Sequence, residues 1–294
     1  MPDPFFSLIV PTYNRAGLIG KTIGSVLSQQ FTDFELIIVD DGSTDHTEEI
    51  VKGIKDPRIF YYKKENAERG AARNFGVKHA KGKYISFLDS DDLLYANHFS
   101  VAFDFISNHS PEIFHLAYQI VSPAGKVLQR MDSIKNINSE IISGNPLSCL
   151  GVFVKRGIII ENLFVEDRQL AGLEDWELWL RISRHYKFQN SNQITSAIVQ
   201  HSQRSVIVDS KERLKAKTKA FLFYATENAA NQKFYGKQLA KTKASIYTYT
   251  ALHLAMVKAN RKETLQYLII GLKENLREIF RKRFFVILKL LLLR

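Results

Sequence analysis

The sequence lacks the features that mark secreted and membrane-spanning proteins. It has one cysteine, Cys149, which excludes an internal disulfide, fits a reducing compartment and is expected as a small buried hydrophobic side chain. No apolar run reaches the ~20 residues needed to cross a bilayer. The first seven residues carry no basic side chain and do not resemble a signal peptide. We therefore expect a globular, cytoplasmic protein.

Acidic residues are scarce in one part of the chain only. Residues 209–294 contain 19 Lys and Arg against 6 Asp and Glu, a net charge of +13, whereas residues 1–208 contain 22 against 24, a net charge of −2. The basic part shows no aromatic-interleaved surface and the body is slightly acidic, so nucleic acid is not expected as a partner. The division predicts a body, residues 1–208, and a basic appendage, residues 209–294.

Strand-like and helix-like segments alternate over the first hundred residues. Between the strand-like runs lie segments with the apolar spacing of helices, and this order predicts an α/β fold with a mostly parallel sheet flanked by helices. The four strand-like runs are residues 7–10, 34–39, 58–62 and 84–88. Residues 113–120 and 150–154 are further strand candidates, and residues 173–186 predict a helix with two tryptophans. Beyond residue 209 the pattern predicts only helices, over residues 211–234, 238–258 and 262–294.

Polar clusters follow three of the predicted strands. They are Pro11–Asn14, Asp40–Ser43 and Asp89–Asp92. Parallel sheets bind ligands at the carboxyl ends of their strands, so these clusters are expected to meet at one edge. The sequence therefore predicts a ligand site there.

Three aspartates fall within four positions in the stretch that reads DSDD, from Asp89 to Asp92. Converging carboxylates repel one another unless a divalent cation neutralises them, and all-oxygen ligation suits Mg²⁺ or Mn²⁺. Such a metal keeps open positions that phosphate oxygens commonly fill. The pattern thus suggests a metal–diphosphate site. A loop whose aspartates cap the next helix is the alternative, and Asp92 fits it best.

The other polar residues have two interpretations each. Asp41 could accept hydrogen bonds from a nucleobase or ribose, or belong to a strand-to-helix turn with Gly42 in the left-handed region. Arg69 and Arg73 lie four residues apart and could meet phosphate or the aspartates, or be solvated. Glu174 and Asp175 start a helix, where acids favour the dipole, but a carboxylate near a bound electrophile is also a general base.

Three stretches together resemble glycosyltransferase family 2, the inverting, nucleotide-sugar-dependent enzymes with a GT-A fold. They read SLIVPTYNRAGLIGKTIGSVLSQQFTDFELIIVDDGSTD, NAERGAARNFGVKHAKGKYISFLDSDD and GLEDWELWLR. They cover about a third of the first 210 residues and occur in the family's order. The resemblance implies a Rossmann-like GT-A domain with an α-helical C-terminal extension.

The resemblance also implies roles by position. Asp91 would ligate Mn²⁺ or Mg²⁺ at the diphosphate, with His201 beside it, and Asp175 of the pair Glu174-Asp175 would be the catalytic base. As an isolated residue, His201 would be read as structural. The residues implied in nucleotide-sugar binding are Pro11, Tyr13, Asn14, Asp41, Arg69, Arg73, Asp89 and Ser90.

The function implied is metal-dependent, inverting transfer of one sugar from a nucleotide sugar, most often a UDP-sugar, to a hydroxyl of a glycan or lipid-linked acceptor. Bacterial surface polysaccharide, lipopolysaccharide or capsule, is the expected product. The Q-x-x-R-W signature of processive members is absent, so polymerisation is not expected. A nucleotidyltransferase and a catalytically inactive nucleotide-sugar-binding protein are the alternatives. The first usually has a Gly-rich basic phosphate loop, which PTYNRAG is not.

The tail ends in a cationic cluster, Arg281–Arg283, followed by ten residues of which nine are apolar. This segment is too short to span a membrane, but as a helix it could lie in the interface against anionic lipid. The alternatives are docking on the protein's own core or on a second subunit, as in a homodimer. Because family acceptors are commonly lipid-linked, we expect peripheral association with the inner face of the cell membrane.

Overall fold

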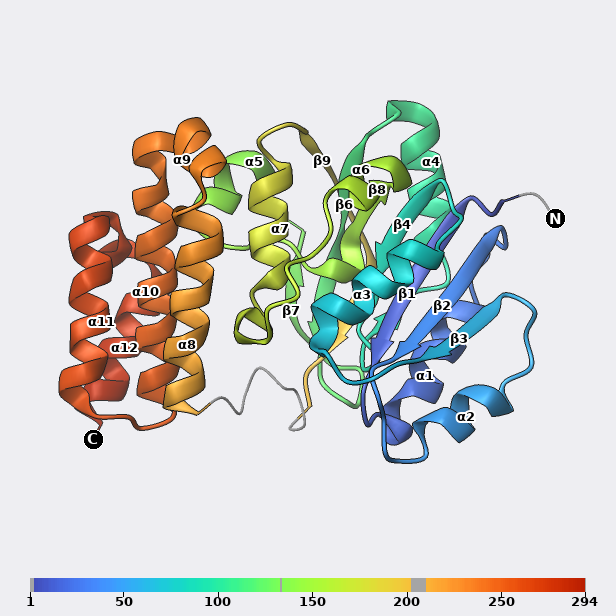
Figure 1. Ribbon diagram of the computed structural model, residues 1–294, viewed down its shortest axis with the longest axis horizontal. Helices are drawn as coiled ribbons and strands as arrows, with labels where there is room; N and C mark the ends of the chain where they lie inside the picture. The colour runs from blue at the N-terminus through green and yellow to red at the C-terminus, as the bar shows by residue number, and fades with distance from the viewer. Residues whose placement is uncertain (1–2, 133, 202–209, 294) are drawn as a thin grey trace. The chain divides into compact units, whose positions relative to one another are not determined.

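A computed structural model describes residues 3–132, 134–201 and 210–293 of the chain (Figure 1). Its contacts divide the chain into two compact units. The sheet unit comprises Met1–Ile137, Leu147–Glu166 and His185–Ser202, and the helical unit comprises Asn138–Pro146, Asp167–Arg184 and Gln203–Arg294. The predicted boundary between residues 208 and 209 falls outside the described residues. Contacts place two segments from the first 208 residues with the tail.

The sheet unit is built on one sheet with the strand order β3-β2-β1-β4-β8-β6-β9-β5, and β7 pairs with β6. The first four strands pair in parallel, as does β6 with β9, while β8, β5 and β7 add antiparallel pairs. The sheet is therefore mixed. The strands are β1 Phe6–Thr12, β2 Phe34–Asp40, β3 Ile59–Lys63, β4 Tyr84–Phe87, β5 Leu93–Leu94, β6 Ile113–Val121, β7 Val127–Met131, β8 Val152–Lys155 and β9 Phe188–Val199.

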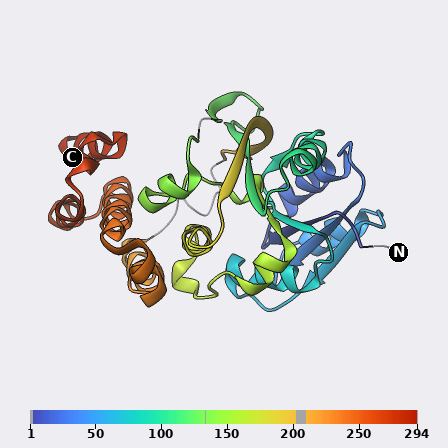
Figure 2. The same cartoon turned by 90° about the horizontal axis from the view of Figure 1, so that it is seen from above.

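Helices cover both faces of this sheet, with α3 and α6 on one face and α1, α2 and α4 on the other (Figures 1 and 2). Alternate β1 residues Phe6, Leu8 and Val10 join the core cluster that also contains the apolar faces of α1 and α4. On the opposite face α3 approaches β1 so closely that a Cβ on Gly76 would lie 2.5 Å from Cγ2 of Ile9. The absence of a side chain at Gly76 allows this approach. The helices of this unit are α1 Ala16–Leu27, α2 Thr47–Gly53, α3 Glu68–His79, α4 His98–His109 and α6 Arg156–Glu161.

The four strands and the helices predicted for the first hundred residues are present. Burial on both sides explains the continuous apolar runs of β1 and β2, every residue of which is buried. The strands β5, β7 and β9 and the helix α4 have no counterpart in the predictions. The strand β9, FQNSNQITSAIV, is mostly polar in its first half and lacks the alternation that marks a strand.

The helical unit contains the predicted tail helices, but two of the three segments are interrupted. A single predicted segment covers α8 and α9, which Asn228 separates by capping the amides of Ala230 and Asn231. Likewise Asn275 caps the amide of Arg277 between α11 and η7. The elements of the helical unit are η1 Ile141–Ser143, η3 Arg168–Leu170, α7 Glu174–Ile182, α8 Lys211–Phe221, a π-helical turn Leu222–Thr226, α9 Ala229–Tyr235, η6 Gly236–Gln238, α10 Leu239–Met256, α11 Arg261–Glu274, η7 Leu276–Phe280 and α12 Lys282–Leu292. The short helix η2 Cys149–Gly151 belongs to the sheet unit. The first residue of α5 Ile137–Glu140 is assigned to the sheet unit and the rest to the helical unit.

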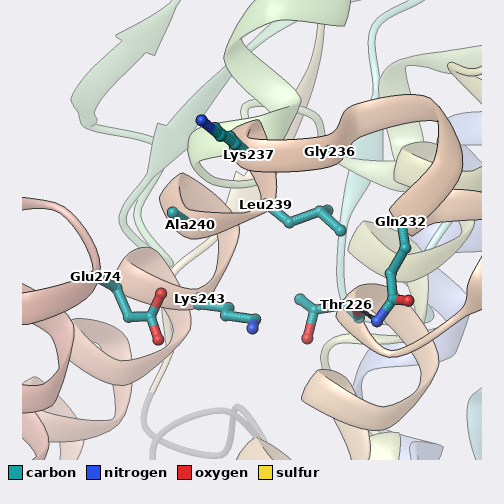
Figure 3. Close-up of a pocket in the computed structure, with 8 residues that line it drawn as sticks. All are labelled: Thr226, Gln232, Gly236, Lys237, Leu239, Ala240, Lys243 and Glu274. Atoms are coloured by element: carbon teal, nitrogen blue, oxygen red, sulfur yellow. Dashed lines mark hydrogen bonds between the residues drawn. The ribbon is translucent and has the colours of Figure 1, made fainter.

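The last three helices pack on one another through a small core of Ala251, Leu268, Ile287 and Leu291. At the other end of α10 a pocket of about 370 Å³ opens, into which Lys243 and Gln232 extend toward Thr226 (Figure 3). None of its eight lining residues is a predicted site residue. Among the described residues, no helix is long and apolar enough to cross a membrane.

Candidate active site

The three polar clusters of the sheet unit lie at the carboxyl ends of β1, β2 and β4, which are neighbours in the sheet. The strand order reverses at β1, between β2 on one side and β4 on the other, and such a reversal leaves a crevice beyond the carboxyl ends of the strands. The arrangement therefore gathers the clusters at the edge of the sheet predicted to bind a ligand.

The loop after β1 presents an aromatic ring and a structural amide. Pro11 is buried within β1, and Tyr13 is 46% exposed. Asn14 has a φ of 50°, its amide N–H donates to Oγ of Ser43, and its Oδ1 accepts from the amide of Thr44 at 2.8 Å. Asn14 thus ties this loop to the loop after β2, and Tyr13 is the residue whose ring faces solvent.

Asp41, at the end of β2, is nearly fully buried. Its Oδ1 accepts hydrogen bonds from Nζ of Lys64 at 2.8 Å and from the amide of Ala67 at 3.0 Å. Among the described residues its Oδ2 accepts none, so this oxygen can receive an N–H or O–H of a ligand. Gly42 has a φ of 85°, the left-handed conformation expected in the alternative interpretation, a strand-to-helix turn.

Arg73 is held inside α3 with 2% of its side chain exposed. Its guanidinium lies over the ring of Phe164, 5.4 Å from the centroid, and donates to Oδ1 of Asp89 at 2.8 Å. The predicted pairing of this helix with the aspartates is therefore present for Arg73. Arg69, one turn earlier on α3, is partly exposed.

Asp91 lies among cationic and protonatable groups. Its Oδ2 is 3.0 Å from Nε2 of His201 and 3.9 Å from Nε of Arg15. His201 lies two residues beyond the end of β9, the strand that the sequence did not reveal, and this strand brings it to the end of β4. The two predicted metal-binding side chains, 110 positions apart in the chain, are thus in contact.

The carboxylates of this turn fit a divalent cation. One oxygen from each of Asp89, Asp91 and Asp92 lies within 4.8 Å of the other two. Three oxygen donors at such spacing suit Mg²⁺ or Mn²⁺, with remaining positions open to phosphate. Asp92 also has a structural bond, since its Oδ1 accepts from the amide of Val199 at 3.0 Å. Asp92 therefore ties the turn to β9 instead of capping a helix.

Ser90, the middle residue of the motif, is 6% exposed. Its carbonyl and that of Asp92 both accept the hydroxyl of Thr22, on α1. The turn is thus fixed by α1 on one side and β9 on the other, which sets the directions of the Asp89 and Asp91 carboxylates.

The acidic pair of α7 belongs to the helical unit. Oδ1 of Asp175 accepts from the amide of Trp176 at 2.7 Å, and its Oδ2 accepts from Nδ2 of Asn145 at 2.9 Å. Glu174 is 3% exposed and its carboxylate accepts from the amide of Gly172. Of the two predicted catalytic acids, Asp175 is partly exposed, whereas Glu174 turns back to hold its own loop.

Several contacts of these residues were not predicted from the sequence. Lys64 is the second of two adjacent lysines after the third predicted strand, Arg15 is a single basic residue in a loop, and Asn145 lies in a segment without a recognisable pattern. For Arg15 a signal existed, because it directly follows the PTYN stretch at the end of the first strand. Nothing in the sequence alone connects Asn145 with Asp175, 30 positions away.

Comparisons with known proteins identify the family of this chain. The family model for glycosyl transferase family 2 matches residues 7–151. The Escherichia coli protein WfgD, a UDP-Glc:α-D-GlcNAc-diphosphoundecaprenol β-1,3-glucosyltransferase, is 31% identical over 183 residues, which cover 62% of this chain and 71% of that protein. The chain belongs to glycosyltransferase family 2. The predictions of the family and of the glycosyltransferase class are therefore confirmed.

Two other relatives extend well beyond the part that this chain matches. An uncharacterized glycosyltransferase of Rickettsia bellii is 37% identical over 185 residues, covering 62% of this chain and 26% of that protein. For a Rickettsia felis relative the identity is 38% and the covered share of the relative is 30%. The chain thus matches less than a third of the length of these two relatives.

Solved structures confirm the predicted GT-A fold. S. aureus TarS 1–349 in complex with UDP-GlcNAc superposes with a TM-score of 0.61 at 19% identity, covering 96% of this chain and 93% of that one. The mannosyltransferase PcManGT of Pyrobaculum calidifontis, in complex with GDP-Man and Mn²⁺, gives a TM-score of 0.65 at 18% identity, covering 99% and 87%. At these identities the likeness extends to the fold alone.

Proposed function

We propose that this family 2 glycosyltransferase is a metal-dependent, inverting enzyme that transfers one sugar from a nucleotide diphosphate sugar to a hydroxyl of a lipid-linked glycan. The observation that carries the proposal is the cluster at the end of β4, where three carboxylates and Arg73 converge. Relatives support the substrate class, since WfgD acts on a diphosphoundecaprenol-linked sugar and TarS binds UDP-GlcNAc.

The donor would be held by residues of the sheet unit. Tyr13 offers an exposed ring to the nucleobase. Oδ2 of Asp41 would accept a hydrogen bond from an N–H group of the nucleobase, since Lys64 bonds to Oδ1. Arg73 holds the Asp89 carboxylate, which lies next to the metal-binding oxygens. Nε of Arg15 lies 3.9 Å from Oδ2 of Asp91, so Arg15 can meet a diphosphate placed there. We assign Arg15 and Arg69 to neutralising the charge of the diphosphate.

Asp91, with Asp89 and His201, would hold the Mn²⁺ or Mg²⁺ ion. When bound, such an ion neutralises the negative charge that builds on the departing nucleoside diphosphate. The fixed turn keeps the carboxylate oxygens in place before the donor arrives, so little reorganisation is needed at the moment of reaction. Arg73 adds a positive charge that burial holds rigid.

Transfer would proceed in one displacement. The acceptor hydroxyl oxygen attacks the anomeric carbon, the bond from that carbon to the phosphate oxygen breaks, and the hydroxyl proton passes to Asp175. Attack from the face opposite the leaving group inverts the anomeric configuration. A single carboxylate base suffices on the acceptor side, and we assign the role to Asp175 and the support of its loop to Glu174.

We propose further that α12 binds an anionic membrane surface. Its inner face, Phe284, Ile287, Leu288 and Leu291, belongs to the core of the last three helices. Its outer face carries four more apolar side chains, Phe285, Val286, Leu292 and Leu293, exposed by 59%, 44%, 84% and 74%. The helix is therefore apolar on both sides, and its own unit covers only one of them.

The charge of the outer face favours lipid over a second copy of this chain. Lys282 and Lys289 are exposed within the same stripe as Phe285 and Leu292. Two copies meeting through α12 would bring lysines against lysines, whereas anionic headgroups neutralise them and the acyl boundary takes the apolar side chains. Peripheral association would place the enzyme beside a lipid-linked acceptor.

The experiment that tests the donor site is a thermal-shift screen of UDP, GDP and dTDP and their sugars, with and without Mn²⁺. A ligand at ~100 times its dissociation constant should stabilise the protein by ~2.7 kcal/mol, which is readily seen. Transfer to a soluble GlcNAc-diphosphate with a short alkyl chain then gives the product, whose anomeric configuration NMR determines. Retention of configuration, or nucleotide binding and turnover indifferent to Mn²⁺ and Mg²⁺, would contradict the proposal.

A further inference from the structure

The carboxylate of Asp175 is held at both of its oxygens within the helical unit. The amide of Trp176, in the first turn of α7, donates to Oδ1, and Nδ2 of Asn145 donates to Oδ2 at 2.9 Å. The first bond comes from the helix that carries Asp175. The second comes from a separate segment, Asn138–Pro146, so this contact depends on where that segment is held.

The segment that carries Asn145 is fixed by side chains from elsewhere in the unit. Three successive carbonyls of η1 each accept a hydrogen bond, at 2.7, 2.7 and 3.0 Å. The acceptors are Ile141, Ile142 and Ser143, and the donors are the indole of Trp176, the hydroxyl of Thr242 and the guanidinium of Arg281. Carbonyls at the end of a short helix need such partners. The position of Asn145 is therefore set by α7, α10 and the residue before α12.

The backbone between η1 and Asn145 is also restricted. Gly144 has a φ of 156°, a value that L side chains rarely adopt. The chain can thus leave η1 in this direction at low cost only because the residue is glycine. Two residues after Ser143, the amide of Asn145 meets the carboxylate.

The helix α7 is secured to the same part of the unit. The Trp176 ring stacks on Phe221 of α8 with a centroid distance of 4.3 Å. Near the other end of α7, the hydroxyl of Tyr235, on α9, donates to the carbonyl of Leu180 at 2.7 Å. The C-terminal helices therefore support both sides of the Asn145–Asp175 contact.

We infer that Asn145 is a positioning residue for the Asp175 base, and that Thr242, through η1, keeps Asn145 in place. This inference rests on the proposed role of Asp175. Asn145 is exposed and Asp175 is partly exposed, so the contact buries little surface and adds little to stability. What the contact does is fix the direction of one carboxylate, and a general base must point at the proton that it removes. The C-terminal region would then contribute to the chemical step as well as to membrane binding.

The test is a double-mutant cycle with Asn145→Ala and Asp175→Asn, assayed with the soluble GlcNAc-diphosphate acceptor and the donor identified by the thermal-shift screen. Asn145→Ala should lower kcat about 10-fold through misdirection of the base, with KM for the donor unchanged. In the Asp175→Asn background the same change should cost less than about 2-fold, because the carboxylate through which it acts is gone. Asn145→Asp, which has the same size but no donor, should lower kcat at least as much as alanine.

A second pair of variants tests the support from α10. Thr242→Val removes the hydroxyl that holds η1 and should lower kcat about 3-fold, again without effect in the Asp175→Asn background. Thr250→Val is the matched control, because it removes a buried hydroxyl of the same helix that bonds to Thr218 and Ile246 instead. It should change the melting temperature but not kcat.

The outcomes separate two failures. If Asp175→Asn turns over normally, the base itself is misassigned, and both the proposed mechanism and this inference fall. If Asp175→Asn is impaired but Asn145→Ala lowers kcat equally in both backgrounds, or not at all, only the positioning role is overturned. A loss of kcat in Thr250→Val as large as in Thr242→Val would overturn the part assigned to Thr242.

Discussion

In the proposed donor site, Asp91 is the residue at which we expect a single substitution to have the largest effect. It contacts His201 and Arg15 and shares the metal-binding geometry of Asp89 and Asp92. Asp91→Asn keeps the shape but removes one negative charge. We expect Mn²⁺-dependent transfer to fall at least ~100-fold, measured as initial rates over a Mn²⁺ series, together with weaker Mn²⁺ binding by electron paramagnetic resonance.

A control for this variant is available on α4. Asp104 is exposed and lies outside the site, so Asp104→Asn removes the same charge without touching the cluster. It should bind Mn²⁺ and transfer sugar as the wild type does. Unchanged Mn²⁺ affinity in Asp91→Asn would remove Asp91 from the metal site.

Asp175→Asn tests the base directly. The amide keeps the size of the side chain but cannot take the acceptor proton at neutral pH, so turnover should fall at least ~10². Donor binding, measured by calorimetry, should be unchanged, because the residues proposed to bind the donor belong to the sheet unit. Weakened donor binding with normal turnover would be the opposite of this expectation.

Two buried histidines make stability sensitive to acid. Burial lowers the pKa of both His98 and His115 to about 3. In the unfolded chain their pKa is ~6.5, so the unfolded state binds more protons between these values. Their contribution is present in full above pH ~6.5 and is lost progressively as the pH falls toward 3.

The window between pH 7.5 and 5 isolates this effect, because most carboxylates titrate below it. Urea midpoints should fall across it, and His98→Gln should reduce the slope. His109→Gln, exposed near the end of α4, is the control and should leave the slope unchanged. A flat stability profile in the wild type would contradict the expectation.

At the scale of elements, α12 gives the sharpest prediction. Replacing Phe285, Val286, Leu292 and Leu293 by serine removes the outer apolar face and leaves the inner face in its core. We expect this variant to lose sedimentation with anionic vesicles but to keep its melting temperature and its activity on the soluble acceptor. Binding equal to wild type would exclude the anchor, and a loss of self-association in its place would identify a dimer face.

The elements also show what the sequence could predict. The strands β1, β2 and β4 were readable because burial on both faces requires continuous apolar runs, and the aspartates that follow them mark their ends. The strand β9 could not be predicted from the sequence. It pairs in parallel with β6 along one side but with only two residues of β5 on the other, so its first half can be polar and shows no strand pattern. The sequence therefore predicted a set of candidate site residues. It did not predict the strand that brings His201 to Asp91.

The predicted boundaries of the tail helices were wrong for a different reason. Their number and breaks depend on asparagines 228 and 275, whose side chains cap the following turn. Asparagine in a polar helical segment is a weak signal, because it is common on exposed faces as well. Roles of the site residues, including the metal, the nucleotide and the base, stay predictions that the experiments above decide.

At the scale of the whole molecule, charge is distributed unevenly. The net charge of +11 comes from residues 209–294, while the rest of the chain is close to neutral. Vesicle binding should therefore weaken steeply between 0.05 and ~0.5 M salt, as screening shortens the reach of the lysines and arginines. Sedimentation at graded salt measures this, with neutral vesicles as the control. Binding that ignores both salt and lipid charge would point to the apolar face alone.

The close approach of α3 to β1 has a consequence for evolution in this protein. At Gly76 there is no room for a methyl group against Ile9, so even alanine would act as a spacer between helix and sheet. Arg73 lies one turn earlier on the same helix, and its Nη2 donates a hydrogen bond to Oδ1 of Asp89 at 2.8 Å. An added methyl group at position 76 would thus shift Arg73 and weaken its bond to Asp89. A larger residue at this position should be tolerated only together with a smaller residue at position 9.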